Sequence, residues 1–369
     1  MPTSIVKGAP GHYQIDEGIL AKFNTFIEEL QVKNIQIISG KKAWEAVKPY
    51  LPKNIVRLEE SQLTFVEGHT TLQTVKRLAE KLNLQSADVV IGIGGGTALD
   101  ITKATAVEAG VKSILIPSIA ATCAAWTPLS VFYDEQGAFT HYTEFPLATT
   151  LVLVEPAIIA HAPVQYLKAG IGDTLAKYYE AAALITSFYK NEELPVPLKV
   201  SQFSAAICRD VLLKDGQAAI ESANQKMISP ALVRVIEAII MTGGMVGGFG
   251  EKAGRVAGAH SVHNGLTEAK EVKPFLHGEL VAYGILVQLA LEKKDEELKK
   301  LLDYYSVWEL PSCLQQLAID VENQVLLSCI IQKMILPQES IHLMEQEITE
   351  DALKDAMLKV EKLNLSKIS

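Results

Sequence analysis

The first 160 residues alternate short apolar, β-branched runs with longer stretches whose apolar positions recur at helical spacing. The runs at 34–39 (NIQIIS), 89–93 (VVIGI) and 113–117 (SILIP) are predicted strands, and helical patterns lie between them. Strands that alternate with helices pair in parallel, with helices on both faces. A polar turn at 134–137 (DEQG) between two further apolar runs predicts a hairpin. This part is therefore predicted to be an α/β domain with a parallel sheet.

After a last strand pattern at 150–155, the apolar spacing is helical almost everywhere. Prolines interrupt the helical pattern at positions 195, 197, 230, 274 and 311. We therefore predict two domains, an α/β domain over residues 1–160 and an all-α domain over residues 161–369.

Length and charge narrow the classes of function. A chain of 369 residues suits two domains. Its formal net charge of -9 argues against nucleic acid or an anionic membrane surface as a partner, since both require basic patches. Apolar stretches such as 280–291 are shorter than the roughly 20 residues that span a bilayer. With no signal-peptide pattern and no C-x-x-C pair among four cysteines, we expect a cytoplasmic protein with reduced thiols.

A strand, a glycine run and a helix start follow one another at 89–103 (VVIGIGGGTALDITK). Successive glycines let backbone N–H groups approach a phosphate, and the helix dipole favours its negative charge. The segment is not a G-x-G-x-x-G motif, because Thr97 stands at the last glycine position. It indicates either a phosphate-binding turn or an ordinary βα turn. The spacing of Asp100 and Lys103 also suits a charge pair at a helix start.

The second domain contains a group of potential metal ligands. Asp173 lies in a mainly apolar helical segment, and His260 and His263 are three residues apart on one helical face. His277 directly precedes another apolar helix, so three of the eight histidines fall between residues 260 and 277. Two imidazoles and one carboxylate with an open fourth position are typical of a catalytic zinc or iron(II) site. A single buried histidine, by contrast, is usually structural.

Five motifs in this order resemble the iron-containing alcohol dehydrogenase superfamily and its glycerol dehydrogenase-like branch. They are GIGGGTALDITKA, IPSIAATCAAWTPLSVFY, LKAGIGDTLAKYYEA, GAHSVHNGLT and HGELVAYG. The resemblance covers nearly the whole chain. It implies a nicotinamide-binding α/β domain, a helical metal-binding domain as in dehydroquinate synthase, a small-molecule substrate and assembly into a homo-oligomer.

The resemblance also implies roles for individual residues. Asp173, His260 and His277 would bind one divalent ion, with zinc expected before iron or another metal. His263 would lie close to the ion without binding it, as a proton relay or as support for a ligand. Asp100 would lie near the nicotinamide. The residues expected to bind the cofactor are Gly94, Gly95, Gly96, Asp100, Lys103, Ser118, Thr122, Thr127, Leu129 and Tyr133.

Two positions depart from the glycerol dehydrogenases. The glycerol dehydrogenases that this chain resembles carry an Asp, which contacts the polyol, at the position of Cys123. They carry a small residue at the position of Arg255. Loss of an anion and gain of a cation favour a substrate with a carboxylate. The chain is thus most similar to hydroxycarboxylate dehydrogenase-like members that interconvert 2-oxo and 2-hydroxy acids. Arg255, five residues before His260, could also be a solvated helix charge.

The end of the predicted strand at 34–39 bears on the choice of cofactor. In the superfamily that this chain resembles, members that prefer NAD carry an Asp at this strand end. Its carboxylate binds the adenosine ribose and repels a 2′-phosphate. Here Gly40 takes that position, and Lys41 and Lys42 follow. We therefore predict NADP(H) in preference to NAD(H), although these residues also suit an exposed turn.

The predicted reaction is metal-assisted hydride transfer between NADP(H) or NAD(H) and a small 2-oxo or 2-hydroxy acid. One alternative is an NAD-dependent glycerol or polyol dehydrogenase. A remote alternative is a lyase similar to dehydroquinate synthase, which would need several Lys and Arg for a substrate phosphate. A third alternative is a non-catalytic nucleotide sensor. The presence of both the candidate metal ligands and the glycine turn argues against it, because a sensor would not require both.

Overall fold

The computed structural model describes residues 5–58, 60–190 and 192–368, and it divides the chain into two compact units. We call them the sheet unit, Lys7–Pro163 with Ser222–Gly244, and the helical unit, Val164–Glu221 with Met245–Ser369 and the residues up to Val6. Both units are discontinuous in sequence. The predicted limits of 1–160 and 161–369 treat each domain as one continuous segment, and they stay a prediction.

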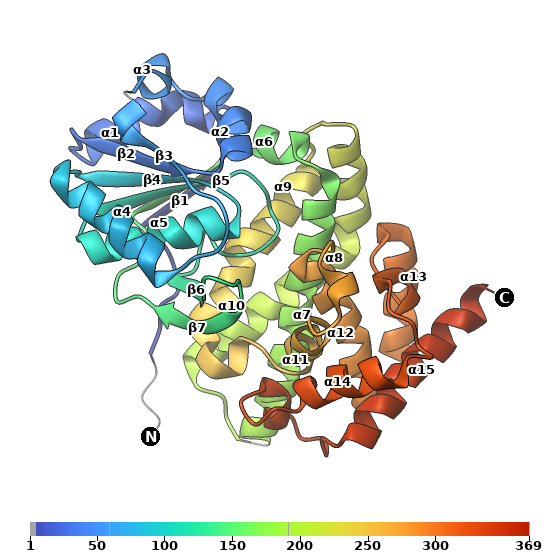
Figure 1. The fold of residues 1–369 in the computed structure, drawn as a ribbon. Coiled ribbons are helices and arrows are strands. Elements are labelled where there is room, and N and C mark those ends of the chain that lie inside the picture. The colour runs from blue at the N-terminus through green and yellow to red at the C-terminus, as the bar shows by residue number, and fades with distance from the viewer. Residues whose placement is uncertain (1–4, 59, 191, 369) are drawn as a thin grey trace. The chain divides into compact units, whose positions relative to one another are not determined.

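The sheet unit contains a six-stranded sheet of order β1-β8-β5-β4-β2-β3 in which every pairing is parallel (Figure 1). This confirms the predicted α/β domain. The strands are β1 His12–Ile15, β2 Ile35–Ser39, β3 Leu63–Phe65, β4 Val89–Gly94, β5 Lys112–Pro117 and β8 Leu151–Val154. The helices are α1 Phe23–Glu29, α2 Lys41–Val47, α3 Lys53–Val56, α4 Leu72–Leu84, α5 Gly96–Ala109, α6 Pro156–His161 and α9 Pro230–Glu237.

Helices cover both faces of this sheet, because its central strands are apolar on both sides. Ile37 and Ile91 pack on one face against a cluster that includes Phe23 of α1 and Trp44 of α2. The neighbouring residues Ile38 and Val90 point to the other face, where α4 and α5 pack. Figure 1 shows α1, α2 and α3 on one side of the strands and α4 and α5 on the other. Strands that are buried on both faces have continuous apolar sequences, and these strands could therefore be predicted from the sequence.

The two outer strands were not predicted. β1 pairs with β8, and β3, only three residues long, pairs with β2. Their side chains are mostly half-buried or exposed, so neither strand carries an apolar run. Their position depends on backbone pairing with a neighbour instead. The predicted hairpin is present as β6 Leu129–Tyr133 and β7 Phe139–Glu144, an antiparallel pair.

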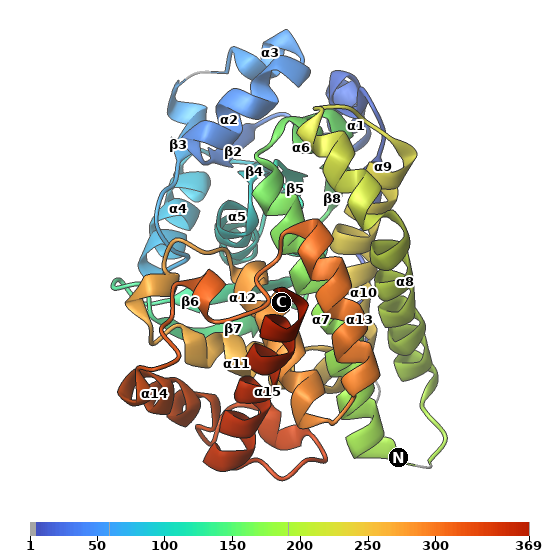
Figure 2. The same ribbon diagram turned by 90° about the vertical axis from the view of Figure 1, so that its right-hand side faces the viewer.

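The helical unit is built around α7, which packs against α12, which in turn packs against α11 and α15 (Figure 2). This confirms the predicted helical second domain. The helices are α7 Val164–Tyr189, α8 Val196–Asn224, α10 Gly243–Gly250, α11 Gly258–Leu266, α12 His277–Leu291, α13 Asp295–Trp308, α14 Gln324–Met334 and α15 Glu350–Ile368. The last turn of α8 and the first residues of α10 belong to the sheet unit. α8 begins between Pro195 and Pro197, and α9 begins at Pro230.

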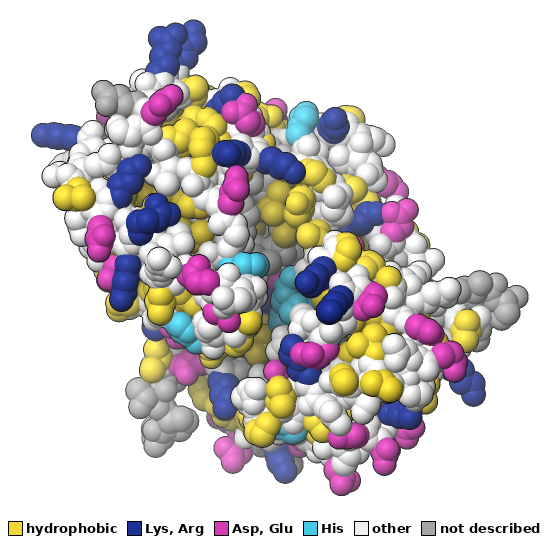
Figure 3. Space-filling model, in the orientation of Figure 1, with side chains coloured by type: hydrophobic (Ala, Val, Ile, Leu, Met, Phe, Trp, Pro, Cys, Tyr) yellow, Lys and Arg dark blue, Asp and Glu magenta, His cyan; other side chains and the backbone are white. Residues whose placement is uncertain are grey.

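In the described part of the chain, one helical run is long and apolar enough to cross a bilayer, which corrects the expectation that the apolar stretches are too short. It covers Pro230–Gly254, where α9 and α10 are joined by a π-helical segment, Ala238–Thr242. Within its most apolar window, 61% is buried inside the protein. A buried helix of this kind is typical of a protein core. Figure 3 shows basic and acidic side chains interspersed over the visible face.

The contact between α7 and α12 requires glycine. A Cβ on Gly278 would lie 1.8 Å from the carbonyl oxygen of Ala169, and a Cβ on Gly172 would lie 2.4 Å from the carbonyl oxygen of Gly278. Both obstacles are backbone atoms, so neither clash can be relieved by a side-chain rotation. The two helix backbones therefore approach more closely than any other residue would allow.

We predict that Gly278→Ala lowers the melting temperature of the helical unit, because overpacking against backbone costs about 1–3 kcal/mol or more. Gly247→Ala in α10 is the matched control, since its Cβ would meet side-chain atoms of Arg255 and none closer than 3.4 Å. Calorimetry of both variants measures the effect. Equal melting temperatures for the two variants would show that α7 and α12 can separate at no cost.

Candidate functional site

The structure brings Asp173, His260 and His277 together in the helical unit. Asp173 lies in α7, His260 in α11, and His277 is the first residue of α12. Oδ1 of Asp173 is 3.5 Å from Nε2 of His260 and 3.4 Å from Nε2 of His277, and all three donor atoms lie within 4.8 Å of one another. Ligand atoms about 2 Å from a tetrahedral ion lie about 3.3 Å apart. The donor set and its spacing fit a divalent metal ion.

Asp173 is kept in the form that binds a cation. Its side chain is almost fully buried, and Nζ of Lys177, one turn later in α7, is 3.8 Å from Oδ2. Burial alone would raise the pKa of the Asp173 carboxyl, but Lys177, His260 and His277 outweigh it and hold that pKa well below its ordinary value. An anionic oxygen is therefore available at neutral pH.

Glu180 fixes the orientation of His260, and sequence reasoning missed it. Oε2 of Glu180 is 2.7 Å from Nδ1 of His260, while Oε1 accepts the backbone N–H groups of Ala257 and His260 at 2.7 and 2.9 Å. A proton on Nδ1 leaves the lone pair of Nε2 directed at the candidate metal position. The available signal was spacing, because Glu180 lies seven residues after Asp173 and so shares its face of α7.

The same carboxylates change the basicity of His260 in the metal-free protein. Burial alone would lower the pKa of the imidazole, but Glu180 and Asp173 outweigh it and raise that pKa to about 9. A metal ion must therefore displace a proton from His260 before it can bind.

His263 contacts a candidate ligand directly. Its Nε2 lies 2.9 Å from Nδ1 of His277, and the two rings meet edge to face. Burial, reinforced by His277 and His260, holds the pKa of His263 well below its ordinary value, so the ring is neutral. His263 thus lies beside the three candidate ligands, and its role as a proton relay or as support for a ligand stays a prediction.

The glycine run forms the turn between β4 and α5 in the sheet unit. Gly94 has a φ of 155°, and a Cβ there would lie 2.7 Å from the Cβ of Ala98. Gly95 precedes α5 without any side-chain cap, and a Cβ on it would lie 2.7 Å from Cδ1 of Ile119. The first N–H groups of this 14-residue helix therefore receive no cap from the N-cap side chain, and side chains at Gly94 and Gly95 would be crowded, which suits the approach of an anion.

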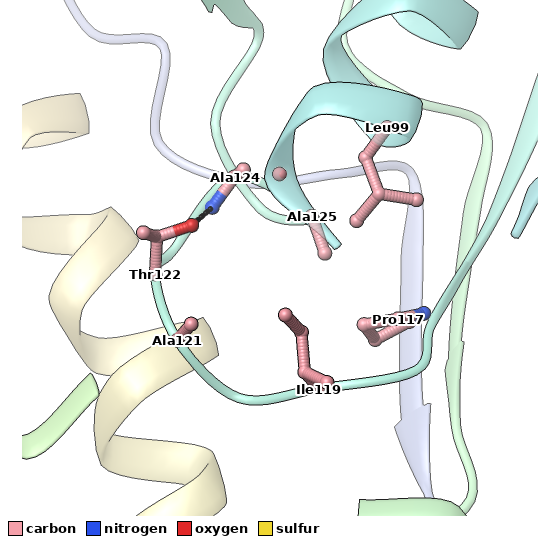
Figure 4. A pocket seen from close by; sticks show the side chains of 8 residues that line it. Leu99, Pro117, Ile119, Ala121, Thr122, Ala124 and Ala125 are labelled. Atoms are coloured by element: carbon pink, nitrogen blue, oxygen red, sulfur yellow. Dashed lines mark hydrogen bonds between the residues drawn. The ribbon is translucent and has the colours of Figure 1, made fainter. Parts of the chain in front are cut away.

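A pocket lies beside this turn, between the start of α5 and the loop after β5 (Figure 4). Its lining includes Gly96 and Thr122, and Oγ1 of Thr122 accepts the N–H of Ala124 at 3.3 Å. The other lining residues are Leu99, Pro117, Ile119, Ala121, Ala124 and Ala125. All of these lining side chains are uncharged. Of the remaining predicted pocket residues, Ser118 and Thr127 are buried, and Leu129 and Tyr133 are half-buried.

Asp100 and Lys103 form a buried ion pair behind the pocket, with 2.9 Å between Oδ1 and Nζ. Nζ of Lys103 also donates to the carbonyl oxygens of Ala124 and Thr127, at 2.7 and 3.0 Å, and to that of Leu129. Oδ2 of Asp100 accepts the N–H of Val131 at 3.0 Å. These contacts hold the loop after β5, which lines the pocket, against α5. Direct cofactor contact by either residue remains a prediction.

Gly40 lies at the carboxyl end of β2, next to the end of β4. It is the N-cap of α2, with a φ of -76° and a ψ of 144°. A Cβ added at Gly40 would have no neighbour closer than the Cβ of Ala43, at 4.0 Å, so a side chain fits here. Lys41 and Lys42 are exposed, and Nζ of Lys41 lies 3.6 Å from Oε1 of the exposed Glu67.

The two residues predicted to shape the substrate site are half-buried and lie in different units. The backbone carbonyl of Cys123 accepts the N–H groups of Trp126 and Thr127, which makes a turn in the pocket loop. The side chain of Arg255 lies against Gly247 of α10, with Nη1 3.4 Å from the position of a Cβ there. Arg255 lies two residues before Ala257, whose backbone N–H donates a hydrogen bond to Glu180.

Comparisons with known proteins agree with this architecture. The family model described as "Iron-containing alcohol dehydrogenase" matches residues 10–156. Hydroxycarboxylate dehydrogenase A from Escherichia coli K12 is 41% identical over 360 residues, covering 98% of both chains. Glycerol dehydrogenase from Pseudomonas putida is 35% identical and covers 80% of both. The crystal structure of glycerol dehydrogenase from Schizosaccharomyces pombe is 26% identical, with a TM-score of 0.86, covering 99% of this chain and 92% of that one.

We predict that zinc binding to the metal-free protein at pH 7 releases about one proton per ion, because His260 is protonated below its pKa of about 9. The apparent affinity should rise about tenfold per pH unit from pH 7 to 9 and then level off. Chelator competition measures the affinity, and calorimetry in buffers of different ionisation enthalpy measures the proton. His277→Ala, which lacks one donor, is the control that should bind weakly. An affinity independent of pH would contradict the assignment of His260.

Proposed function

The chain belongs to the iron-containing alcohol dehydrogenase family and is a dehydrogenase; from that membership we propose that it transfers a hydride between a nicotinamide cofactor and a small 2-oxo or 2-hydroxy acid. The observation that supports this most is the convergence of Asp173, His260 and His277 at one point. We assign these three residues to one divalent ion, zinc before iron.

In this reaction the hydroxy acid loses a hydride and a proton as its carbinol carbon becomes a carbonyl, and reduction takes up both. When bound, a divalent ion held by Asp173, His260 and His277 would supply Lewis acidity, and a nicotinamide at the glycine turn would supply or accept the hydride. The protein's own residues orient these groups. Glu180 directs Nε2 of His260, and the ionised Asp173 supplies the negative charge that holds a cation.

The cofactor part of the proposal rests on the turn after β4. We assign the pyrophosphate to the N–H groups at Gly95 and Gly96, where α5 begins uncapped. The buried Lys103 keeps the opposite wall of the pocket in place through three carbonyl groups, which limits the conformational entropy that cofactor binding must remove.

The substrate part rests on two lines of support. The Escherichia coli relative, which is similar over nearly its whole length, is named a hydroxycarboxylate dehydrogenase. A substrate site with Cys123 and Arg255 carries less negative charge than a polyol site with an Asp at the position of Cys123. The glycerol dehydrogenases among the relatives support the alternative of a polyol substrate.

We predict that small 2-oxo acids are reduced with a far higher kcat/KM than that of glycerol oxidation. Arg255→Ala should raise KM for the acid by about 10- to 100-fold, since a hydrogen bond between charged groups contributes about 1.5–3 kcal/mol. Absorbance of the reduced nicotinamide follows both reactions. Lys252→Ala, which removes an exposed cation of the same segment, is the control and should leave KM unchanged. Efficient glycerol oxidation without activity on 2-oxo acids would assign the chain to the polyol dehydrogenases.

Our proposal for the cofactor is NADP(H) before NAD(H). Gly40 carries no carboxylate to repel a 2′-phosphate, and Lys41 and Lys42 follow it at the start of α2. The same strand end lies beside the glycine turn, because Ser39 of β2 pairs with Ile93 of β4.

We predict that Gly40→Asp shifts the ratio of kcat/KM values from NADPH toward NADH by about tenfold or more, through a new ribose contact and repulsion of the phosphate. The backbone at Gly40 accepts a side chain, and an Asp at an N-cap stabilises a helix, so the variant should fold. Lys22→Ala, an exposed lysine of the same unit, is the control for net charge. A wild-type preference for NADH would contradict this assignment.

A further inference from the structure

We propose that Glu339 sets the tautomer of His277 through Asn264 and His263, and thereby directs the unprotonated Nε2 of His277 to the metal position. Glu339 and Asn264 then act as positioning residues at a distance from the ion. The inference rests on the proposed metal site of Asp173, His260 and His277, and it concerns how one of those ligands is prepared.

Four side chains form a continuous series of hydrogen bonds. Nδ1 of His277 lies 2.9 Å from Nε2 of His263, and Nδ1 of His263 lies 3.0 Å from Oδ1 of Asn264. Nδ2 of Asn264 donates to both carboxylate oxygens of Glu339, at 3.2 and 3.0 Å. Each ring nitrogen and each amide atom in the series therefore faces one defined partner.

The direction of the series is fixed at Glu339. An ionised carboxylate can only accept hydrogen bonds, so the amide of Asn264 must turn its NH₂ group toward Glu339. The amide oxygen then faces His263, and an oxygen without a proton can only accept. His263 must therefore carry its proton on Nδ1.

The second half of the series transmits this direction to the metal site. A neutral imidazole protonated on Nδ1 has a lone pair on Nε2, which must accept from Nδ1 of His277. His277 is then protonated on Nδ1 and unprotonated on Nε2, 3.4 Å from Oδ1 of Asp173. Both atoms present lone pairs to the same point, as a cation requires.

The segment that carries Glu339 is held firmly against α11. It precedes a short helix, Ser340–Leu343, in which the N–H of the fully buried Ile341 donates to Oγ of Ser261 at 3.1 Å. Oγ of Ser261 in turn donates to the carbonyl oxygen of Ala257 at 3.0 Å. Glu339 is thus positioned by the same helix, α11, that carries Asn264 and His263.

The two histidine ligands are therefore oriented by different means. Glu180 contacts His260 directly, whereas Glu339 acts on His277 through two intervening side chains. In both cases a carboxylate outside the ligand set determines which nitrogen keeps the proton. Removing the charge of Glu339 leaves the amide of Asn264 free to reverse, and a reversed amide favours the tautomer of His277 that cannot bind metal.

The first test is the affinity of the metal-free protein for zinc, measured by competition with a chelator at pH 8. Glu339→Gln should weaken binding about tenfold, the usual order for loss of a partner outside the ligand set. Glu345→Gln is the matched control, because it removes an exposed carboxylate from the same segment and should leave the affinity unchanged.

A double variant separates direction from packing. In Asn264→Asp with Glu339→Gln the amide and the carboxylate exchange places, so an oxygen still accepts from His263 while the new amide at position 339 donates. This pair should recover the affinity that Glu339→Gln alone loses. A role of Glu339 in packing alone would predict no recovery, and that result would overturn the proposal.

The second test is independent of metal affinity. Nitrogen-15 chemical shifts of the histidine rings in the zinc-loaded and metal-free wild-type protein report which ring nitrogen carries the proton. We expect His263 and His277 to be protonated on Nδ1 in both states, and Glu339→Gln to give mixed tautomers in the metal-free state. A proton on Nε2 of His263 in the wild type would reject the proposal, whatever the variants do.

The outcomes also distinguish this inference from the proposed function. A wild-type protein that binds no zinc would reject the metal site, and the inference with it. Tight zinc binding by the wild type, with unchanged affinity and tautomers in Glu339→Gln, would reject only the role of Glu339.

Discussion

The candidate metal site depends on how closely α7 and α12 can approach. Asp173 and His277 lie on these two helices, and their ligand atoms meet only because Gly172 and Gly278 allow one backbone to lie against the other. A Cβ at either glycine would lie too close to a backbone oxygen, so the two helices would have to move apart. Close packing of backbones, rather than the choice of ligands, is therefore the first requirement of the site.

Buried charge is treated alike in both units. In the helical unit, Asp173 is paired with Lys177, and Glu180 is satisfied by two backbone N–H groups and one imidazole. In the sheet unit, Lys103 satisfies three carbonyl groups and one carboxylate. Glu180 and Lys103 each make several hydrogen bonds, so each fixes the conformation of a loop or a helix end as well as its own charge.

Much of the architecture could be predicted because it follows from local pattern. The central strands are continuous apolar runs, so the sheet and the hairpin were accessible from the sequence. The candidate ligands Asp173, His260 and His277 stand in motifs that resemble the dehydrogenase family, and that resemblance singled out the three residues that the structure brings together. β1 and β3 were not predicted, since their pairing partners determine them. Asn264 and Glu339 also escaped prediction, because a hydrogen bond between residues 75 positions apart leaves no periodic signal. Glu180 was missed although its spacing from Asp173 places both residues on one face of α7.

The discontinuity of the sheet unit has a consequence for biosynthesis. Ser222–Gly244 belongs to that unit, where α9 packs against α6 and Gly244 lies against Trp126. A nascent chain can therefore form all of its strands, which end at Val154, well before the segment that completes their unit leaves the ribosome. During that interval the exposed apolar surface of α6 and Trp126 must be kept from wrong partners. A fragment that ends near residue 160 would remain in that incomplete state.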